Sequence, residues 1–68
     1  MKEVDARGLS CPEPVMLLAD ALKGQEKEIL LLVDDFAPIE NCTRYAENHG
    51  CQVKRQDKED YTELRISR

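Results

Sequence analysis

Basic and aromatic side chains are scarce in this sequence of 68 residues. Ten Lys and Arg stand against 14 Asp and Glu, which gives a net charge of −4 at pH 7, and two Tyr and one Phe are the only aromatics. Binding to nucleic acid through its phosphates needs clustered basic side chains. We therefore do not expect this chain to bind nucleic acid directly.

Long hydrophobic runs are also absent. The longest strictly apolar run, Ile29 to Val33, is far too short to cross a bilayer. Lys2, Glu3 and Asp5 place charge where a signal peptide would be apolar. We therefore expect a cytoplasmic protein that does not associate with membranes. Thiols stay reduced in that compartment, so all three cysteines should be free.

A single histidine and the lack of a Cys-x-x-Cys pair limit the available chemistry. The fourth position of such a pair after Cys11 is Pro14, so no neighbouring thiol could resolve a disulfide there. His49 is expected far from Cys11, at the other end of a helix, which argues against a Cys–His dyad. A zinc site would have only Cys42, His49 and Cys51 as ligands, and Cys42 falls on an apolar helix face. We expect no metal and no cofactor.

Cys11 is the thiol whose surroundings suggest reactivity. It precedes Pro12, whose fixed φ suits the first position of a helix, and a residue before proline is pushed toward extended geometry. We therefore predict that Cys11 is the N-cap of a helix over residues 12–23, facing the free N–H of Glu13. The positive end of a helix favours a thiolate, which is the nucleophilic form of cysteine. The alternative is that Cys11 is a small buried residue beside a proline-rich helix start.

Six further residues are expected to shape the site around this thiol. Gly8 permits a tight turn into the loop, and Arg7 adds positive charge upstream of Cys11. Asp35 follows a buried strand and should lie at the same sheet edge as Cys11, whereas we interpret Asp34 as a strand stop and a charge at a helix start. The six are Arg7, Gly8, Pro12, Glu13, Pro14 and Asp35.

The pattern of apolar residues predicts a single domain over residues 1–68 with the element order βαβαββ. The expected strands cover residues 2–7, 27–33, 51–55 and 61–66, the expected helices cover residues 12–23 and 37–49, and a polar turn covers 56–60. Strand–helix–strand units imply parallel pairing with right-handed crossovers. The fold class is therefore an α/β two-layer sandwich, in which a mixed four-stranded sheet carries two helices on one face. The uncovered face is a candidate surface for a partner or for a homodimer.

Two of the three cysteines are expected in the core. Cys42 shares a helix face with Ile39 and Ala46, at spacings of three and four residues. Cys51 opens a strand directly after Gly50, which we predict to end the preceding helix. Neither thiol is therefore a candidate nucleophile.

The stretch from Asp5 to Val15, DARGLSCPEPV, resembles the signature of the TusA/SirA-like sulfur-carrier family, including its Cys-Pro-x-Pro core. The resemblance extends along almost the whole chain, and the segment from Ile39 to Cys51 is more similar to the YedF branch. It implies a fold similar to the C-terminal domain of a translation initiation factor. It also implies that Cys11 carries sulfur as a persulfide, taken from a cysteine desulfurase or another donor protein and relayed to an acceptor protein.

Three functions remain open on the sequence alone. The first is the sulfur carrier, or sulfurtransferase, that acts through a persulfide on Cys11. The second is a non-catalytic regulatory or interaction module that uses the uncovered sheet face. A carrier in selenium metabolism, of the YedF type, is a variant of the first. The third is RNA binding by analogy with the initiation-factor-like fold, which the net charge of −4 and the three aromatic residues disfavour.

Overall fold

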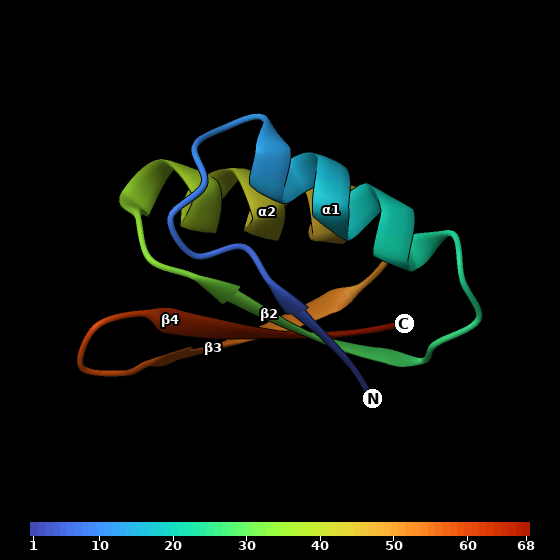
Figure 1. Cartoon of the computed structure of the whole chain (residues 1–68). Helices are drawn as coiled ribbons and strands as arrows, with labels where there is room; N and C mark the ends of the chain where they lie inside the picture. The colour runs from blue at the N-terminus through green and yellow to red at the C-terminus, as the bar shows by residue number, and fades with distance from the viewer.

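The computed structural model describes residues 1–68 and has the predicted element order. Its strands are β1 (Lys2–Asp5), β2 (Glu28–Val33), β3 (Gln52–Asp57) and β4 (Thr62–Ser67), and its helices are α1 (Glu13–Leu22) and α2 (Phe36–Asn48). Both helices lie on the same face of the sheet (Figure 1). The predicted α/β two-layer sandwich is therefore confirmed. Neither helix is long and apolar enough to cross a membrane.

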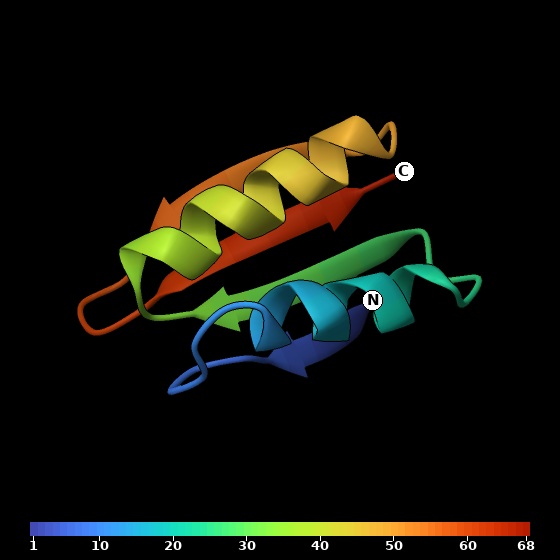
Figure 2. The same ribbon diagram turned by 90° about the horizontal axis from the view of Figure 1, so that it is seen from above.

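The order of the strands explains why the two helices begin side by side. The sheet runs β1–β2–β4–β3, with β1 parallel to β2 and with β4 antiparallel to both of its neighbours. Viewed from above, α1 lies along β1 and β2 while α2 lies along β3 and β4 (Figure 2). Because β1 and β2 point the same way, the loops that follow them leave the same edge of the sheet. That edge is where both helices start.

The hydrophobic core fills the space between the helices and the sheet. Alternate residues of β2 face it, while the side chains of Leu30 and Leu32 lie on the other face of the sheet and are half-buried and buried, respectively. Cys42 is fully buried and Cys51 is 9% exposed, so the prediction that both belong to the core is confirmed. The core consists of Ala6, Leu18, Ala21, Ile29, Leu31, Val33, Ile39, Cys42, Ala46, Cys51, Leu64 and Ile66.

The ends of α2 and β3 show how local hydrogen bonds set the boundaries. Gly50 adopts a φ of +79°, and the N–H groups of Gly50 and Cys51 donate to the carbonyls of Glu47 and Ala46, as in a Schellman motif. At the hairpin, β3 continues to Asp57, whose carboxylate accepts a hydrogen bond of 2.9 Å from Thr62. The predicted polar turn over residues 56–60 is therefore wrong by two residues at its start.

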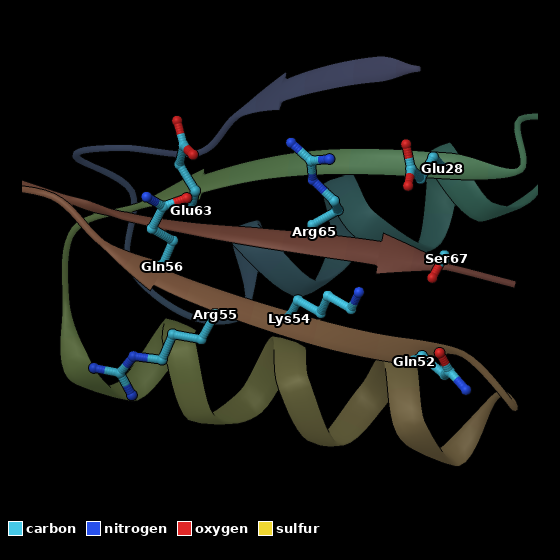
Figure 3. A pocket seen from close by; sticks show the side chains of 8 residues that line it. All are labelled: Glu28, Gln52, Lys54, Arg55, Gln56, Glu63, Arg65 and Ser67. Carbon is cyan, nitrogen blue, oxygen red and sulfur yellow. The ribbon is translucent and has the colours of Figure 1, made fainter.

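The uncovered face of the sheet is mostly polar, with Leu30 and Leu32 as its apolar residues on β2. Figure 3 shows the hollow on this face, of about 480 Å³, with the side chains of Lys54 and Arg65 on neighbouring strands. None of its lining residues is hydrophobic; they are Glu28, Gln52, Lys54, Arg55, Gln56, Glu63, Arg65 and Ser67. A partner or second copy on this face therefore stays a prediction, and it would have to be held mainly by charges and hydrogen bonds.

Arg68 ties the end of the chain to the end of α1. Its guanidinium donates to the carbonyls of Leu22, Gly24 and Glu26 at 2.6, 2.8 and 2.9 Å, and its backbone N–H donates to Lys27 at 3.1 Å. Carbonyls at the end of a helix lack hydrogen-bond donors within the helix. The side chain of Arg68 supplies donors to them. The connection between α1 and β2 is closed by a residue from the far end of the sequence.

We expect Arg68→Ala to lower the free energy of unfolding by about 1–2 kcal/mol, because three hydrogen bonds to carbonyl groups are lost. Urea denaturation followed by circular dichroism measures this. Arg65→Ala is the matched control, since Arg65 is exposed on the uncovered face and has no hydrogen bond or ion pair. An equal loss of stability in both variants would contradict the role we give to Arg68.

Candidate active site

The loop that carries Cys11 is held to the sheet at two points. The N–H of Ala6 donates to the carbonyl of Leu32 at 2.8 Å, which extends the pairing of β1 with β2. The N–H of Gly8 donates to both carboxylate oxygens of Asp34 at 3.0 Å. Gly8 has a φ of +78°, in the left-handed region that favours glycine. Asp34 is thus more than the strand stop that we predicted, because it anchors the loop.

Asp35 serves the helix that follows it. It is the N-cap of α2, and its carboxylate accepts a hydrogen bond of 2.8 Å from the N–H of Phe36. Its side chain lines a hollow that α2 shares with the β3–β4 hairpin, and the groove beside Cys11 is a different one. Its predicted role in shaping the Cys11 site stays a prediction.

Arg7 stabilises the loop through its neighbours. Its guanidinium forms two hydrogen bonds of 2.9 Å with Asp5 and lies 5.0 Å from the centre of the Tyr61 ring. The hydrogen bonds from Arg7 lower the pKa of the Asp5 carboxyl to about 2. The charge that we expected to support the thiolate is therefore paired with Asp5, and Arg7 does not line the groove beside Cys11.

Cys11 lies just outside α1, not at its N-cap. The N–H of Glu13 donates to the carbonyl of Ser10 at 3.0 Å, which closes a turn with Cys11 and Pro12 in the middle; the peptide bond between these two residues is cis. The first helical hydrogen bond runs from Met16 to Pro12, so Pro12 is the N-cap and the helix begins one residue later than predicted. The prediction that the N–H of Glu13 faces the thiol is also wrong, because the Ser10 carbonyl occupies it.

The hydrogen-bond donor to the thiol comes from the other helix. The side-chain amide of Asn41 donates to the Sγ of Cys11 at 3.1 Å. Asn41 lies 30 residues further along the sequence, and both residues are partly buried. The sequence reasoning missed Asn41. The one available signal was its position beside the apolar stripe of a helix that begins at the same sheet edge as Cys11.

Cys11 opens onto a groove of about 290 Å³ between the start of α1 and the side of α2. Of the residues predicted to shape the site, Pro12 lines this groove, while Pro14 is fully buried and Glu13 faces a separate hollow with Leu9 and Met16. The groove is lined by Cys11, Pro12, Val15, Asn41, Arg44, Tyr45 and Asn48.

The neighbouring thiol of Cys42 is chemically unlike Cys11. Cys42 is fully buried, and this burial raises the pKa of its thiol from 9.0 to about 12, with a smaller contribution from Cys11. A thiol with so high a pKa stays protonated at neutral pH and is a poor nucleophile. The structure therefore leaves Cys11 as the accessible thiol. No group of three or more His, Cys, Asp or Glu side chains is placed to hold a metal ion.

Comparison with known proteins identifies the family of this chain. The family model of Sulfurtransferase TusA matches residues 2–68. The chain belongs to the TusA family. This confirms the family that the Cys-Pro-x-Pro stretch indicated, while the YedF branch stays a prediction.

Two further proteins are similar to this chain in sequence or in structure. A Methanocaldococcus jannaschii protein with the name "Putative sulfur carrier protein" is 44% identical over 55 residues, which cover 78% of this chain and 73% of that protein. The crystal structure of a SirA-like protein from Desulfitobacterium hafniense has a TM-score of 0.88 and 30% sequence identity, over 98% of this chain and 96% of that one. This TusA-family chain is therefore similar in sequence to a putative sulfur carrier protein and has the fold of a SirA-like protein.

We expect Asn41→Ala to slow the alkylation of Cys11 by iodoacetamide at neutral pH by about tenfold, because a hydrogen bond to a charged group contributes on the order of 1.5 kcal/mol. The variant should keep the wild-type circular dichroism spectrum, so that a loss of folded structure does not account for the slower reaction. Asn48→Ala is the matched control, since Asn48 lines the same groove without bonding to the sulfur. An unchanged rate of alkylation in both variants would show that the amide of Asn41 does not act on the thiol.

Alkylation should also separate the thiols of the folded protein. At pH 8 we expect Cys11 to be labelled first and Cys42 only after denaturation, since its raised pKa and its burial both oppose reaction. The raised pKa of Cys42 also affects stability. Its thiol ionises near pH 9.0 in the unfolded chain and near pH 12 in the folded protein, so the free energy of unfolding falls as the pH rises above about 9. Mass mapping of the labelled peptides checks the order. Labelling of Cys42 as fast as Cys11 in the native protein would contradict it.

Proposed function

We propose that this chain is a sulfur carrier in which Cys11 holds sulfur as a persulfide between a donor protein and an acceptor protein. Membership of the TusA family supports a carrier role in general. The observation that most supports Cys11 is the hydrogen bond from Asn41 to its sulfur at one end of an open groove. Cys42 and Cys51 are buried, so they lack the access that a partner needs.

Loading is a transfer of sulfur with no net oxidation. The thiolate of Cys11 attacks the terminal sulfur of a persulfide on the donor. A sulfur–sulfur bond forms at Cys11, the sulfur–sulfur bond of the donor breaks, and the donor cysteine leaves as a thiolate. The proton stays on the terminal sulfur as that sulfur is transferred to Cys11, so atoms, charge and electrons balance.

Unloading reverses the same step. A thiolate of the acceptor attacks the terminal sulfur, and Cys11 is now the leaving group. The anion on Sγ is thus present at the start of loading and at the end of unloading. Asn41 is placed to stabilise it at both points, because its amide N–H already donates to that sulfur. The remaining residues of the loop act by holding Cys11 at the groove.

We propose a cysteine desulfurase as the donor and the cytoplasm as the compartment, since the step needs reduced thiols. Within the family we assign the chain to the YedF branch, on the sequence from Ile39 to Cys51. YedF-type carriers are associated with selenium. A selenium atom would be transferred in the same way, with a bond from it to the sulfur of Cys11 formed and its bond to the donor broken.

We expect incubation with a cysteine desulfurase and cysteine to add one sulfur atom to the wild-type protein, and none to Cys11→Ser, because only Cys11 is accessible as a nucleophile. Intact-protein mass spectrometry under non-reducing conditions measures the gain, which reductant should reverse. Replacing cysteine by selenocysteine in the same assay tests for the gain of a selenium atom.

Cys51→Ser serves as the matched control, since it removes a buried thiol and should leave loading intact. A Cys11→Ser protein that still gains a sulfur atom would contradict the assignment. So would a folded wild-type protein that gains none from any of several desulfurases, which would favour a non-catalytic module.

A further inference from the structure

The groove beside Cys11 differs in charge from the rest of this acidic surface. The structure has four hollows, and the other three are each lined by at least two carboxylates. The Cys11 groove has none, and its one charged lining residue is Arg44. In a protein with a net charge of −4, the reactive thiol therefore opens onto the one hollow with a purely positive charge.

Arg44 is not used by the fold. It is exposed, and its guanidinium forms neither a hydrogen bond nor an ion pair within the chain. The nearest carboxylates along α2, Glu40 and Glu47, are not within ion-pair distance of it. An arginine carries a fork of donors that matches a carboxylate. Arg44 is thus available to a carboxylate that comes from outside the chain.

The shape of the groove suits a segment of extended chain. From Asn41 to Asn48 the groove follows eight residues of α2. The seven steps between them span about 10 Å at a helical rise of about 1.5 Å per residue, which matches about three extended residues. Its volume of about 290 Å³ lies at the lower end of small-molecule sites, and its rim residues Arg44 and Asn48 are exposed. It is a shallow channel, unlike a cavity that encloses a ligand.

The lining offers both kinds of contact that a peptide needs. Pro12, Val15 and the ring of Tyr45 supply an apolar surface. The side-chain oxygen of Asn41 and the amide of Asn48 remain free to pair with the N–H and carbonyl groups of a peptide backbone, because only the Nδ2 of Asn41 is bonded to Cys11.

We propose that this groove seats an extended acidic segment of the sulfur-donor protein, with the donor's reactive cysteine at Cys11 and a carboxylate within about three residues of it at Arg44. This rests on the proposed function of Cys11 as a sulfur acceptor. Arg44 selects the partner by charge, and Asn41 and Asn48 hold the backbone in line with the thiol.

The test measures how fast Cys11 forms mixed disulfides with short synthetic peptides. Each peptide has an acetylated N-terminus, an amidated C-terminus and one cysteine. In one set the cysteine is followed by two Glu, two Gln or two Lys, and in the other set these residues precede it. The cysteine is activated as its 2-thiopyridyl disulfide. The Cys11 thiolate attacks the peptide sulfur, a new disulfide forms, and 2-thiopyridone leaves and is followed by absorbance. Peptide mapping verifies that Cys11 is the residue modified.

At low ionic strength we expect the Glu peptides of one set to react about threefold faster than the Gln peptides, and the Lys peptides to react more slowly still. Arg44→Gln should remove this order and Arg44→Glu should reverse it. Arg65→Glu, the same charge change on the uncovered face of the sheet, should keep the wild-type order. Added salt should weaken the preference, because the charges are exposed.

Two results would overturn the proposal. One is an order of rates that is the same in wild type and in Arg44→Glu. The other concerns the 2-thiopyridyl disulfide of mercaptoacetate, a small anion. If substitution of Arg44 changes its rate of reaction with Cys11 as much as the rates of the peptides, or more, the groove binds a small anion and no peptide. Since neither assay transfers a persulfide, a peptide preference in a protein that cannot be loaded with sulfur would refute the carrier function and not the groove.

Discussion

The carboxylate of Asp34 holds the Cys11 site in place. It stands at the end of β2, the most deeply buried strand, and both of its oxygens accept the N–H of Gly8. This contact joins the loop after β1 to the loop after β2, the two loops that lead into the helices. With that junction fixed, the turn around Cys11 meets the side of α2, and Asn41 reaches the sulfur. A hydrogen bond from a backbone N–H to a carboxylate is stronger than one between neutral groups, which suits an anchor at an exposed position.

The fold of this protein follows from its sequence because hydrophobic spacing carries the needed information. The apolar run from Ile29 to Val33 predicted a central strand, and the stripe of Ile39, Cys42 and Ala46 predicted a buried helix face, as the structure has them. Boundaries were less accurate. They depend on single hydrogen bonds, such as that from Glu13 to Ser10, which no hydrophobic pattern encodes.

The site was predictable only in part, for the same reason. Two prolines and a glycine near Cys11 marked it as the candidate thiol and predicted a turn beside it. Which group would donate to its sulfur depended on how the loop packs across to α2, a contact between residues 30 positions apart. Reasoning from neighbouring residues assigned that role to the backbone N–H of Glu13, which instead donates to the carbonyl of Ser10. Asn41 and Asn48 are the same residue type on the same helix, and only their positions along it decide which one reaches the sulfur.

The position of β4 also bears on how the protein is made. The last strand in the sequence lies in the interior of the sheet, between β2 and β3. Until Thr62–Ser67 has left the ribosome, β3 has no strand to pair with and β2 has only β1. Most of the sheet therefore depends on contacts distant in sequence, the kind that slow folding. The sheet that supports both helices, and with them the groove beside Cys11, is therefore completed only when translation of the domain ends.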